Sequence, residues 1–198
     1  RAIRLMNQLL LLARQEAAAT QGTAPQALNL QQLVQQVVAE VLPQAGERSI
    51  DLGTRDPTPV WLDGEAEALR ILLRNLLENA IKYSPRGGRV DVAVATLDGQ
   101  PCLTVEDSGP GIAEEDRTHV FERFFRGSLT SGGGSGLGLA IVQAIAVQHR
   151  ATVSLGRSAT LGGLQVQVVF GGAGAGANGQ TNAPGAPQER ESPSGAAA

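Results

Sequence analysis

Apolar residues recur at helical spacing in several parts of the chain. The clearest run is Glu65–Tyr83, in which one face is apolar. That face carries Leu69, Leu72, Leu73, Leu76, Leu77 and Ala80. A second helix is expected to begin at a cap formed by Asn29 and to end near Pro43. A third helix, Gly136–Gln148, is apolar on almost every side, which predicts that it is buried.

Alternation of apolar and polar residues predicts the strands. Val90, Val92 and Val94 alternate with other residues, and the turn Asp98-Gly99 brings the chain back as a partner strand. Other expected strands are Cys102–Glu106, Ser49–Gly53, Val60–Leu62, Thr152–Leu155 and Leu164–Phe170. Because helices and strands are interspersed, the pattern predicts a mixed sheet covered on one face by helices, an α/β two-layer sandwich.

The two ends of the chain differ from this central part. Residues 1–19 show another helical pattern, whereas residues 171–198 are rich in Gly, Ala, Pro and Ser. We therefore expect one folded domain at 26–170, preceded by a separate helix and followed by a disordered tail. Because the chain starts with Arg inside a helical pattern, we interpret it as a fragment of a longer protein.

Composition narrows the class of protein. The formal net charge of −3 argues against a nucleic-acid-binding surface. A single cysteine excludes a disulfide framework and a cysteine-based metal site. No run of about twenty apolar residues is present, so the sequence predicts no membrane-spanning helix.

A polar face accompanies the apolar stripe at the end of the Glu65–Tyr83 helix. At about 100° per residue, Asn75, Asn79 and Lys82 fall within roughly 60° of one another. An Asn oxygen can ligate a hard cation such as Mg²⁺, and a Lys ammonium can meet a phosphate. A solvated Asn and Lys face would show the same spacing, so this stretch alone leaves both interpretations open.

Three further motifs follow in order. Asp107–Ile112 reads Asp-Ser-Gly-Pro-Gly-Ile after an expected strand, which places a carboxylate beside a close-approach turn. Phe121–Arg126 combines three aromatic rings with two arginines. Gly132–Gly138 opens a helix whose first N–H groups favour a phosphate, and no Lys follows these glycines, which excludes a P-loop.

Together the four motifs resemble the ATP-binding catalytic domain of a bacterial two-component sensor histidine kinase. That domain belongs to the superfamily shared with gyrase, heat-shock chaperone and mismatch-repair ATPases. The stretches that resemble its N box, first glycine box, F box and second glycine box are, in that order, Asn75–Tyr83, Asp107–Ile112, Phe121–Arg126 and Gly132–Gly138. The resemblance covers roughly residues 1–170. It implies that nucleotide lies between helices and a mobile lid at 113–135, and that residues 1–19 are the second helix of a dimerisation hairpin.

The resemblance assigns roles to individual residues. Asp107 is expected to accept a hydrogen bond from the adenine amino group, and Asn79 to ligate the Mg²⁺ that bridges the phosphates. Either Arg123 or Arg126 is expected to stabilise charge on the γ-phosphoryl group. The other residues expected to contact ATP are Asn75, Lys82, Tyr83, Gly109, Gly111, Ile112, Gly134, Gly136, Leu137 and Gly138.

The resemblance also implies a phosphoacceptor and partners. Sensor histidine kinases transfer the γ-phosphoryl group to a histidine on a helical dimerisation hairpin, for relay to the receiver domain of a response regulator. Neither His119 nor His149 has the neighbours of such an acceptor. We therefore expect the acceptor upstream of residue 1, and expect this chain to bind Mg-ATP without phosphorylating itself. The parent is expected to be a homodimeric inner-membrane protein with this domain in the cytoplasm.

Two other functions remain open. A nucleotide-binding module without catalysis would be expected to have lost some ligand-type residues, all of which are present here. A different ATPase of the same superfamily, or a serine kinase acting on a regulatory protein, would not be expected to carry the F box and the N-terminal helical pattern. The sequence therefore favours an active kinase domain.

Overall fold

The computed structural model describes residues 25–55, 58–125 and 135–171. The helix expected at 1–19 and the expected tail beyond Gly171 lie outside these ranges, as does part of the expected lid. None of the helices in the described ranges is long and apolar enough to cross a membrane.

Five strands form the main sheet, in the spatial order β2-β4-β5-β7-β6. The first pair, β2 with β4, is parallel, and the other neighbouring pairs are antiparallel. The sheet is therefore mixed, as predicted. Its strands are β2 Asp51–Arg55, β4 Arg89–Leu97, β5 Gln100–Asp107, β6 Ala151–Arg157 and β7 Leu164–Phe170.

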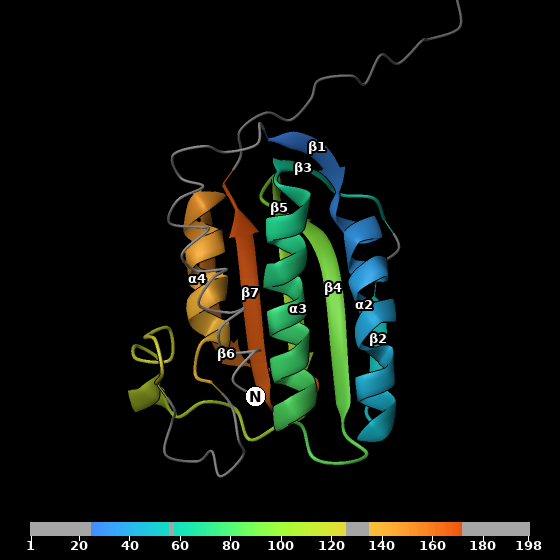
Figure 1. Cartoon of the computed structure of the whole chain (residues 1–198), viewed down its shortest axis with the longest axis vertical. Coiled ribbons are helices and arrows are strands. Elements are labelled where there is room, and N and C mark those ends of the chain that lie inside the picture. The colour runs from blue at the N-terminus through green and yellow to red at the C-terminus, as the bar shows by residue number, and fades with distance from the viewer. Residues whose placement is uncertain (1–24, 56–57, 126–134, 172–198) are drawn as a thin grey trace, which may run out of the picture.

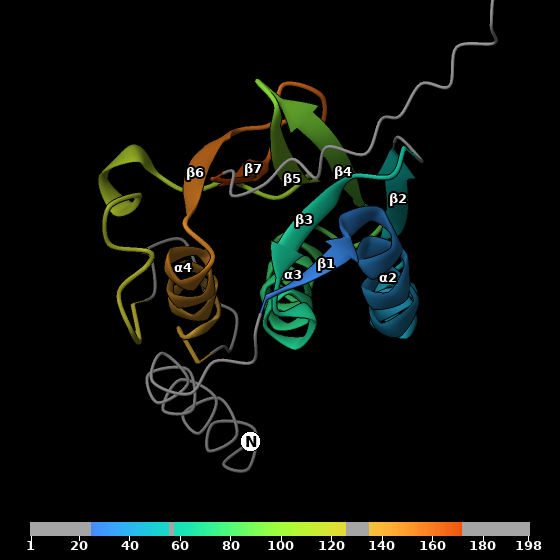
Figure 2. The same cartoon turned by 90° about the horizontal axis from the view of Figure 1, so that it is seen from above.

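The three described α-helices lie on one face of this sheet (Figures 1 and 2). They are α2 Leu30–Glu47, α3 Ala66–Tyr83 and α4 Gly138–Gln148. Seen from above, the helices form one layer and the sheet forms the other (Figure 2). This arrangement confirms the expected α/β two-layer sandwich.

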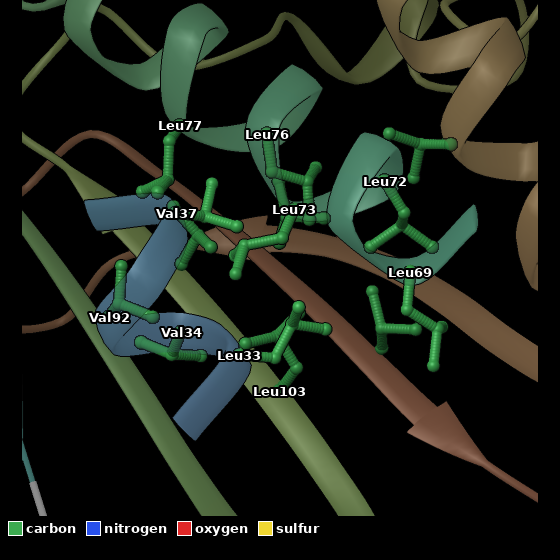
Figure 3. Packing of buried hydrophobic residues seen from close by; sticks show 14 of the residues in the cluster. Leu33, Val34, Val37, Leu69, Leu72, Leu73, Leu76, Leu77, Val92 and Leu103 are labelled. Atoms are coloured by element: carbon green, nitrogen blue, oxygen red, sulfur yellow. The ribbon is translucent and has the colours of Figure 1, made fainter. Parts of the chain in front are cut away.

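The core lies between the two layers (Figure 3). The labelled side chains are Leu69, Leu72, Leu73, Leu76 and Leu77 of α3, Leu33, Val34 and Val37 of α2, Val92 of β4 and Leu103 of β5. Full burial of one such side chain contributes about 1.5–3 kcal/mol relative to leaving it exposed. The apolar stripe that predicted α3 therefore fixes this helix on the sheet, and thereby orients the polar face beside the stripe.

The C-terminal end of α2 differs from its predicted position. Asn29 caps the helix as expected, because its Oδ1 accepts a hydrogen bond from a first-turn N–H at 3.2 Å. The helix does not end near Pro43 but continues through it to Glu47. A proline removes one helical hydrogen bond. Val41 and Ala45 are nevertheless buried in the core on either side of it, and their burial keeps the last turn helical.

A short two-stranded sheet was only half predicted. Its strands, β1 Gln26–Asn29 and β3 Trp61–Gly64, are antiparallel. They lie at one end of α2 and α3 (Figures 1 and 2). The sequence predicted a strand close to β3 but not β1, because four residues leading into a helix show no alternation that a pattern can detect.

The opposite end of the sandwich is where β5 ends, α3 ends and α4 begins (Figure 1). The described part of the expected lid, residues 113–125, also lies there, beside α4 (Figures 1 and 2). It consists of one 3₁₀ turn, η1 Glu114–Asp116, and a series of turns and bends. The topology therefore brings the predicted motifs to one end of the molecule.

Candidate functional site

Asp107 is the last residue of β5, and its side chain is buried. One carboxylate oxygen, Oδ1, accepts hydrogen bonds from the backbone N–H of Gly109 at 2.8 Å and of Leu164 at 3.0 Å. In the described part of the chain, the other oxygen, Oδ2, accepts no hydrogen bond. The carboxylate is therefore held in one orientation, with one oxygen left for a ligand.

Burial also changes the acidity of this group. Removal from water raises the pKa of the Asp107 carboxyl, and the two backbone hydrogen bonds oppose this shift without cancelling it. A buried carboxylate that keeps an unused acceptor and a perturbed pKa is typical of a binding site.

The glycines after Asp107 allow close backbone contacts. A Cβ at Gly109 would lie 2.9 Å from the carbonyl oxygen of Tyr83, at the end of α3. Gly111 has a φ of +77°, which a side chain would strain. Ile112, which follows, is half-buried. The first glycine motif is therefore packed against the C-terminal end of α3.

The second glycine motif meets α3 one to two turns earlier. A Cβ at Gly138 would lie 2.9 Å from Nδ2 and 3.2 Å from Oδ1 of Asn79, and 3.5 Å from Oδ1 of Asn75. The two asparagines are therefore together, as their helical spacing predicted. Asn75 also donates from Nδ2 to the carbonyl oxygen of Ile71 at 2.8 Å, so part of its side chain is already engaged.

Gly138 is also the first residue of α4. Among the described residues, no side chain caps this helix. Its first N–H groups therefore point out of the helix without a capping side chain, next to the Asn79 carboxamide. An uncapped helix N-terminus beside a carboxamide can bind an anionic group such as a phosphate.

Lys82 and Tyr83 interact with each other. The Lys82 Nζ lies 2.9 Å from the Tyr83 hydroxyl and 4.4 Å from the centroid of its ring. Both residues were expected to contact ATP, the lysine through its ammonium at a phosphate. In the structure the ammonium is held over the ring, at the end of the helix that carries both asparagines.

The lid joins the second glycine motif through backbone contacts. The N–H of Phe124 donates to the carbonyl oxygen of Gly136 at 2.9 Å. Both residues have positive φ, +66° for Phe124 and +68° for Gly136, and a Cβ on Gly136 would lie 2.7 Å from the Phe124 carbonyl carbon. The side chain of Leu137 is fully buried in the core, so only its backbone can face a ligand. Arg123 is exposed, whereas Arg126 and Gly134 lie outside the described residues.

Two residues of this site were not among the predicted ones. A Cβ on Gly163 would overlap the carbonyl oxygen and Oδ1 of Asp107 and would lie 2.5 Å from the Gly109 nitrogen. Leu164 supplies the second N–H to Asp107. The sequence predicted the flanking strands, Thr152–Leu155 and Leu164–Phe170, but nothing in it indicated that the turn between them lies beside Asp107.

A family model described as histidine kinase-, DNA gyrase B-, and HSP90-like ATPase matches residues 64–172. This range contains Asn79, Asp107, Gly138 and Gly163, and so spans the described site.

Two relatives of the chain are sensor proteins. The chain is 41% identical over 169 residues to the sensor protein QseC of Salmonella typhi, a match that covers 85% of this chain and 36% of QseC. It is 39% identical over 166 residues to the sensor protein kinase PmrB of Pseudomonas aeruginosa, covering 83% of this chain and 34% of PmrB. The chain therefore spans about a third of the length of these relatives.

Two solved structures share the fold. The mycobacterial sensor histidine kinase MprB matches with a TM-score of 0.66 and 32% identity, over 74% of this chain and 96% of that one. Full-length ShkA, solved in complex with AMPPNP, matches with a TM-score of 0.73 and 29% identity, over 85% of this chain and 35% of that one.

Proposed function

We propose an ATP-binding mode for this chain, which belongs to the histidine kinase-, DNA gyrase B- and HSP90-like ATPases and is the catalytic ATPase domain of a two-component sensor histidine kinase. Adenine binds at Asp107, and the phosphates bind between Asn79 and the N-terminus of α4. The domain transfers the γ-phosphoryl group to a histidine. The observation that carries this proposal is the buried Asp107 carboxylate with one free acceptor oxygen.

The adenine end of the proposed site follows from hydrogen-bond chemistry. An ionised carboxylate only accepts hydrogen bonds, and the exocyclic amino group of adenine only donates them. Oδ1 of Asp107 is occupied by two backbone donors, so Oδ2 is the oxygen that meets the base. Gly109 and Gly111 leave room for the ring, and Ile112 and Tyr83 contribute the neighbouring surface.

The phosphate end relies on charge and backbone dipoles. We assign the phosphates to the N–H groups at the start of α4 and to the glycines that precede it, Gly134 and Gly136. Lys82 supplies a positive charge after leaving the Tyr83 ring. Arg123 or Arg126 would reach the γ-phosphoryl group when the lid closes and stabilise the charge that develops there.

The residues present fit a magnesium ion held mainly by the phosphates. No cluster of three or more His, Cys, Asp or Glu in the described ranges could hold a metal by itself. Mg²⁺ usually keeps several waters and binds through one or two protein oxygens together with substrate phosphates. The carboxamide oxygen of Asn79 is the donor we assign, with Asn75 supporting it. When bound, the ion would neutralise charge on the β- and γ-phosphates.

We propose that neither of this chain's two histidines accepts the phosphoryl group. Nδ1 of His119 is 2.8 Å from Oε1 of Glu122. His149 is held by a hydrogen bond from the Glu65 N–H to its Nε2 at 3.1 Å and by one from its Nδ1 to the Ile145 carbonyl at 2.9 Å. Both rings are engaged in local contacts. We therefore propose that the acceptor lies on a helical dimerisation hairpin. We also propose that the phosphoryl group is relayed to a response regulator. The parent is proposed to be a homodimeric, membrane-bound protein with this domain in the cytoplasm.

Transfer can be tested with labelled nucleotide. The chain is incubated with Mg²⁺ and [γ-³²P]ATP, alone and with a separate polypeptide that carries the dimerisation hairpin. Acid-labile, base-stable label is expected on the hairpin and not on the chain. Label on the chain alone would contradict the assignment of the acceptor. ATP binding without label on either polypeptide would instead favour a nucleotide-binding module that does not catalyse transfer.

Replacing Asn79 by alanine should weaken ATP binding only when Mg²⁺ is present. The loss of one oxygen that interacts with a charged group is worth about 1.5–3 kcal/mol, or roughly 10- to 150-fold in affinity. Calorimetric titration of ATP in Mg²⁺ and in EDTA measures this difference. Gln36→Ala, which removes an exposed carboxamide from α2, is the control and should change neither affinity. Equal losses in Mg²⁺ and EDTA would show that Asn79 does not act through the metal.

A further inference from the structure

The sheet face opposite the helices carries a network of charged and polar side chains. Side chains along β5 alternate between the two faces, so Asp107 faces the helices and its neighbour Glu106 faces the other way. No helix covers that face in the described ranges (Figure 2). Even so, Glu106 and the neighbouring Asp91 of β4 are buried, by the side chains around them.

Glu106 binds the turn that joins β6 to β7. Its Oε1 accepts hydrogen bonds from the Ser158 hydroxyl at 2.9 Å and from Gln165 Nε2 at 3.2 Å. Its Oε2 accepts one from the Thr160 hydroxyl at 3.2 Å. The NH2 group of Arg55 lies 3.4 Å from the same oxygen. Both carboxylate oxygens are therefore occupied. Of the four partners, Ser158 and Thr160 lie in the turn, and Gln165 lies just after it.

Asp91 anchors the other end of the network. Arg55 forms a salt bridge with it, and Arg89 donates to its Oδ1 at 2.9 Å. Burial disfavours the charged form of Asp91, but the hydrogen bonds from both arginines outweigh burial and lower the pKa of this carboxyl. A Cβ on Gly53 would lie 2.7 Å from Oδ1 of Asp91, so the absence of a side chain there leaves room for this carboxylate.

A buried network of this kind adds little net stability. Desolvation of the charges offsets most of their attraction, and well-packed apolar side chains would often serve as well. Such a network does fix one arrangement of the groups that it joins, because each hydrogen bond is lost if the arrangement changes. The group that Glu106 fixes is the β6–β7 turn.

The β6–β7 turn also binds Asp107. The Ser158 N–H donates to the Gly163 carbonyl at 2.8 Å, and the Gly163 N–H donates to the Asp107 carbonyl at 3.1 Å. The next N–H, from Leu164, donates to Oδ1 of Asp107 at 3.0 Å. Two consecutive residues of β5 therefore bind one turn from opposite faces of the sheet, Glu106 through side chains and Asp107 through backbone N–H groups.

We propose that Glu106 is a positioning residue for adenine recognition: by binding Ser158 and Thr160 it holds the Leu164 N–H against Asp107 and so aims Oδ2 of that carboxylate at the base. The inference rests on the proposed function, because it assumes that Asp107 meets the adenine amino group. Glu106 itself touches no nucleotide in this arrangement.

The test compares two nucleotides that differ only in that amino group. ATP and purine riboside 5′-triphosphate, which lacks it, are titrated in Mg²⁺ into the wild-type chain, Glu106→Ala and Glu106→Gln. Glu106→Ala should lower the affinity for ATP about tenfold and change that for the analogue much less, so the ratio of the two affinities falls toward one. Glu106→Gln keeps an oxygen for Ser158 and Gln165 and should retain most of the ratio.

Matched variants separate positioning from general stability. Glu40→Ala removes an exposed carboxylate that pairs with Arg70 and should leave the ratio unchanged. Ser158→Ala breaks the same contact from the turn side and should lower the ratio as Glu106→Ala does, which keeps the test decisive if Glu106→Ala does not fold.

Each outcome addresses a distinct claim. A wild-type chain that binds both nucleotides equally would contradict the adenine role of Asp107, and with it the proposed function. A wild-type chain that discriminates, with variants that lose affinity for both nucleotides equally or for neither, would overturn only the positioning role of Glu106.

Discussion

Asp107→Asn is expected to weaken ATP binding strongly while the domain stays folded. The asparagine Oδ1 can accept the same two hydrogen bonds from Gly109 and Leu164. Its Nδ2 then takes the place of Oδ2 and presents a donor to the adenine amino group, which is also a donor. The variant loses one hydrogen bond and places two donors against each other. This costs about 2–4 kcal/mol of binding free energy, a loss of roughly 30- to 1,000-fold in affinity. Calorimetric titration of ATP in Mg²⁺ measures it.

The matched control is Asp98→Asn. Asp98 is exposed in the turn between β4 and β5, at the far end of the hairpin from Asp107, and its φ of +50° is one that asparagine tolerates. This variant should bind ATP as the wild type does. Wild-type affinity in Asp107→Asn would place the adenine elsewhere and would remove the main support for the proposed site.

The raised pKa of Asp107 gives this variant a second consequence. The folded domain holds the proton on this carboxyl more tightly than the unfolded chain, whose carboxyl titrates near its ordinary value of 3.8. The contribution of Asp107 to stability without nucleotide therefore falls as pH rises from about 3.8 through the raised folded pKa, and this loss persists at neutral pH. Asp107→Asn removes this loss, so its thermal midpoint at pH 7 should equal or exceed that of the wild type.

ATP affinity should follow the opposite trend with pH. Binding requires the ionised carboxylate, so the affinity of the wild type should increase as pH rises through the raised pKa of Asp107 and then level off. Thermal unfolding and ATP titration over one pH series test both slopes. An ATP affinity that stays level or falls as pH rises through this range would contradict the assigned role of Asp107.

Gly163→Ala is expected to destabilise the domain and to weaken ATP binding together. The added methyl group would overlap the carbonyl oxygen and Oδ1 of Asp107, and the nearest atom of Gly109 is a backbone nitrogen at 2.5 Å. Backbone cannot move aside as a flexible side chain can, so the turn and Asp107 must separate. Overpacking of this kind costs about 1–3 kcal/mol, and the displaced carboxylate loses the Leu164 hydrogen bond. Chemical unfolding and ATP titration measure the two effects.

Gly46→Ala provides the comparison. Gly46 lies in α2, and a Cβ there would meet nothing within 4 Å. Alanine is favoured over glycine in a helix by about 0.5–1 kcal/mol, so this variant should be slightly more stable and bind ATP normally. If Gly163→Ala were as stable and as active as Gly46→Ala, the close contact with Asp107 would not be required.

Much of the fold was predictable because its patterns are local. The leucine stripe of α3 and the alternating valines of β4 each repeat within a few residues, and the structure confirms both elements. Pro43 misled the prediction for α2, because a local helix breaker was outweighed by burial that depends on the packed sheet. The asparagine face beside the α3 stripe was predicted correctly, since one helix fixes the relative positions of Asn75 and Asn79.

By itself, the sequence determined most of the elements and the residue types that carry the chemistry: a carboxylate, two carboxamides and glycines at helix and strand ends. Only the tertiary structure decided what Asp107 touches. Leu164 lies 57 positions away, and Ser158 lies 52 positions from Glu106, and strand order and register bring each pair together. Periodicity records which face of an element is buried, because that depends on neighbours along the chain. It cannot record which turn lies beside which strand, because that depends on how the whole core packs.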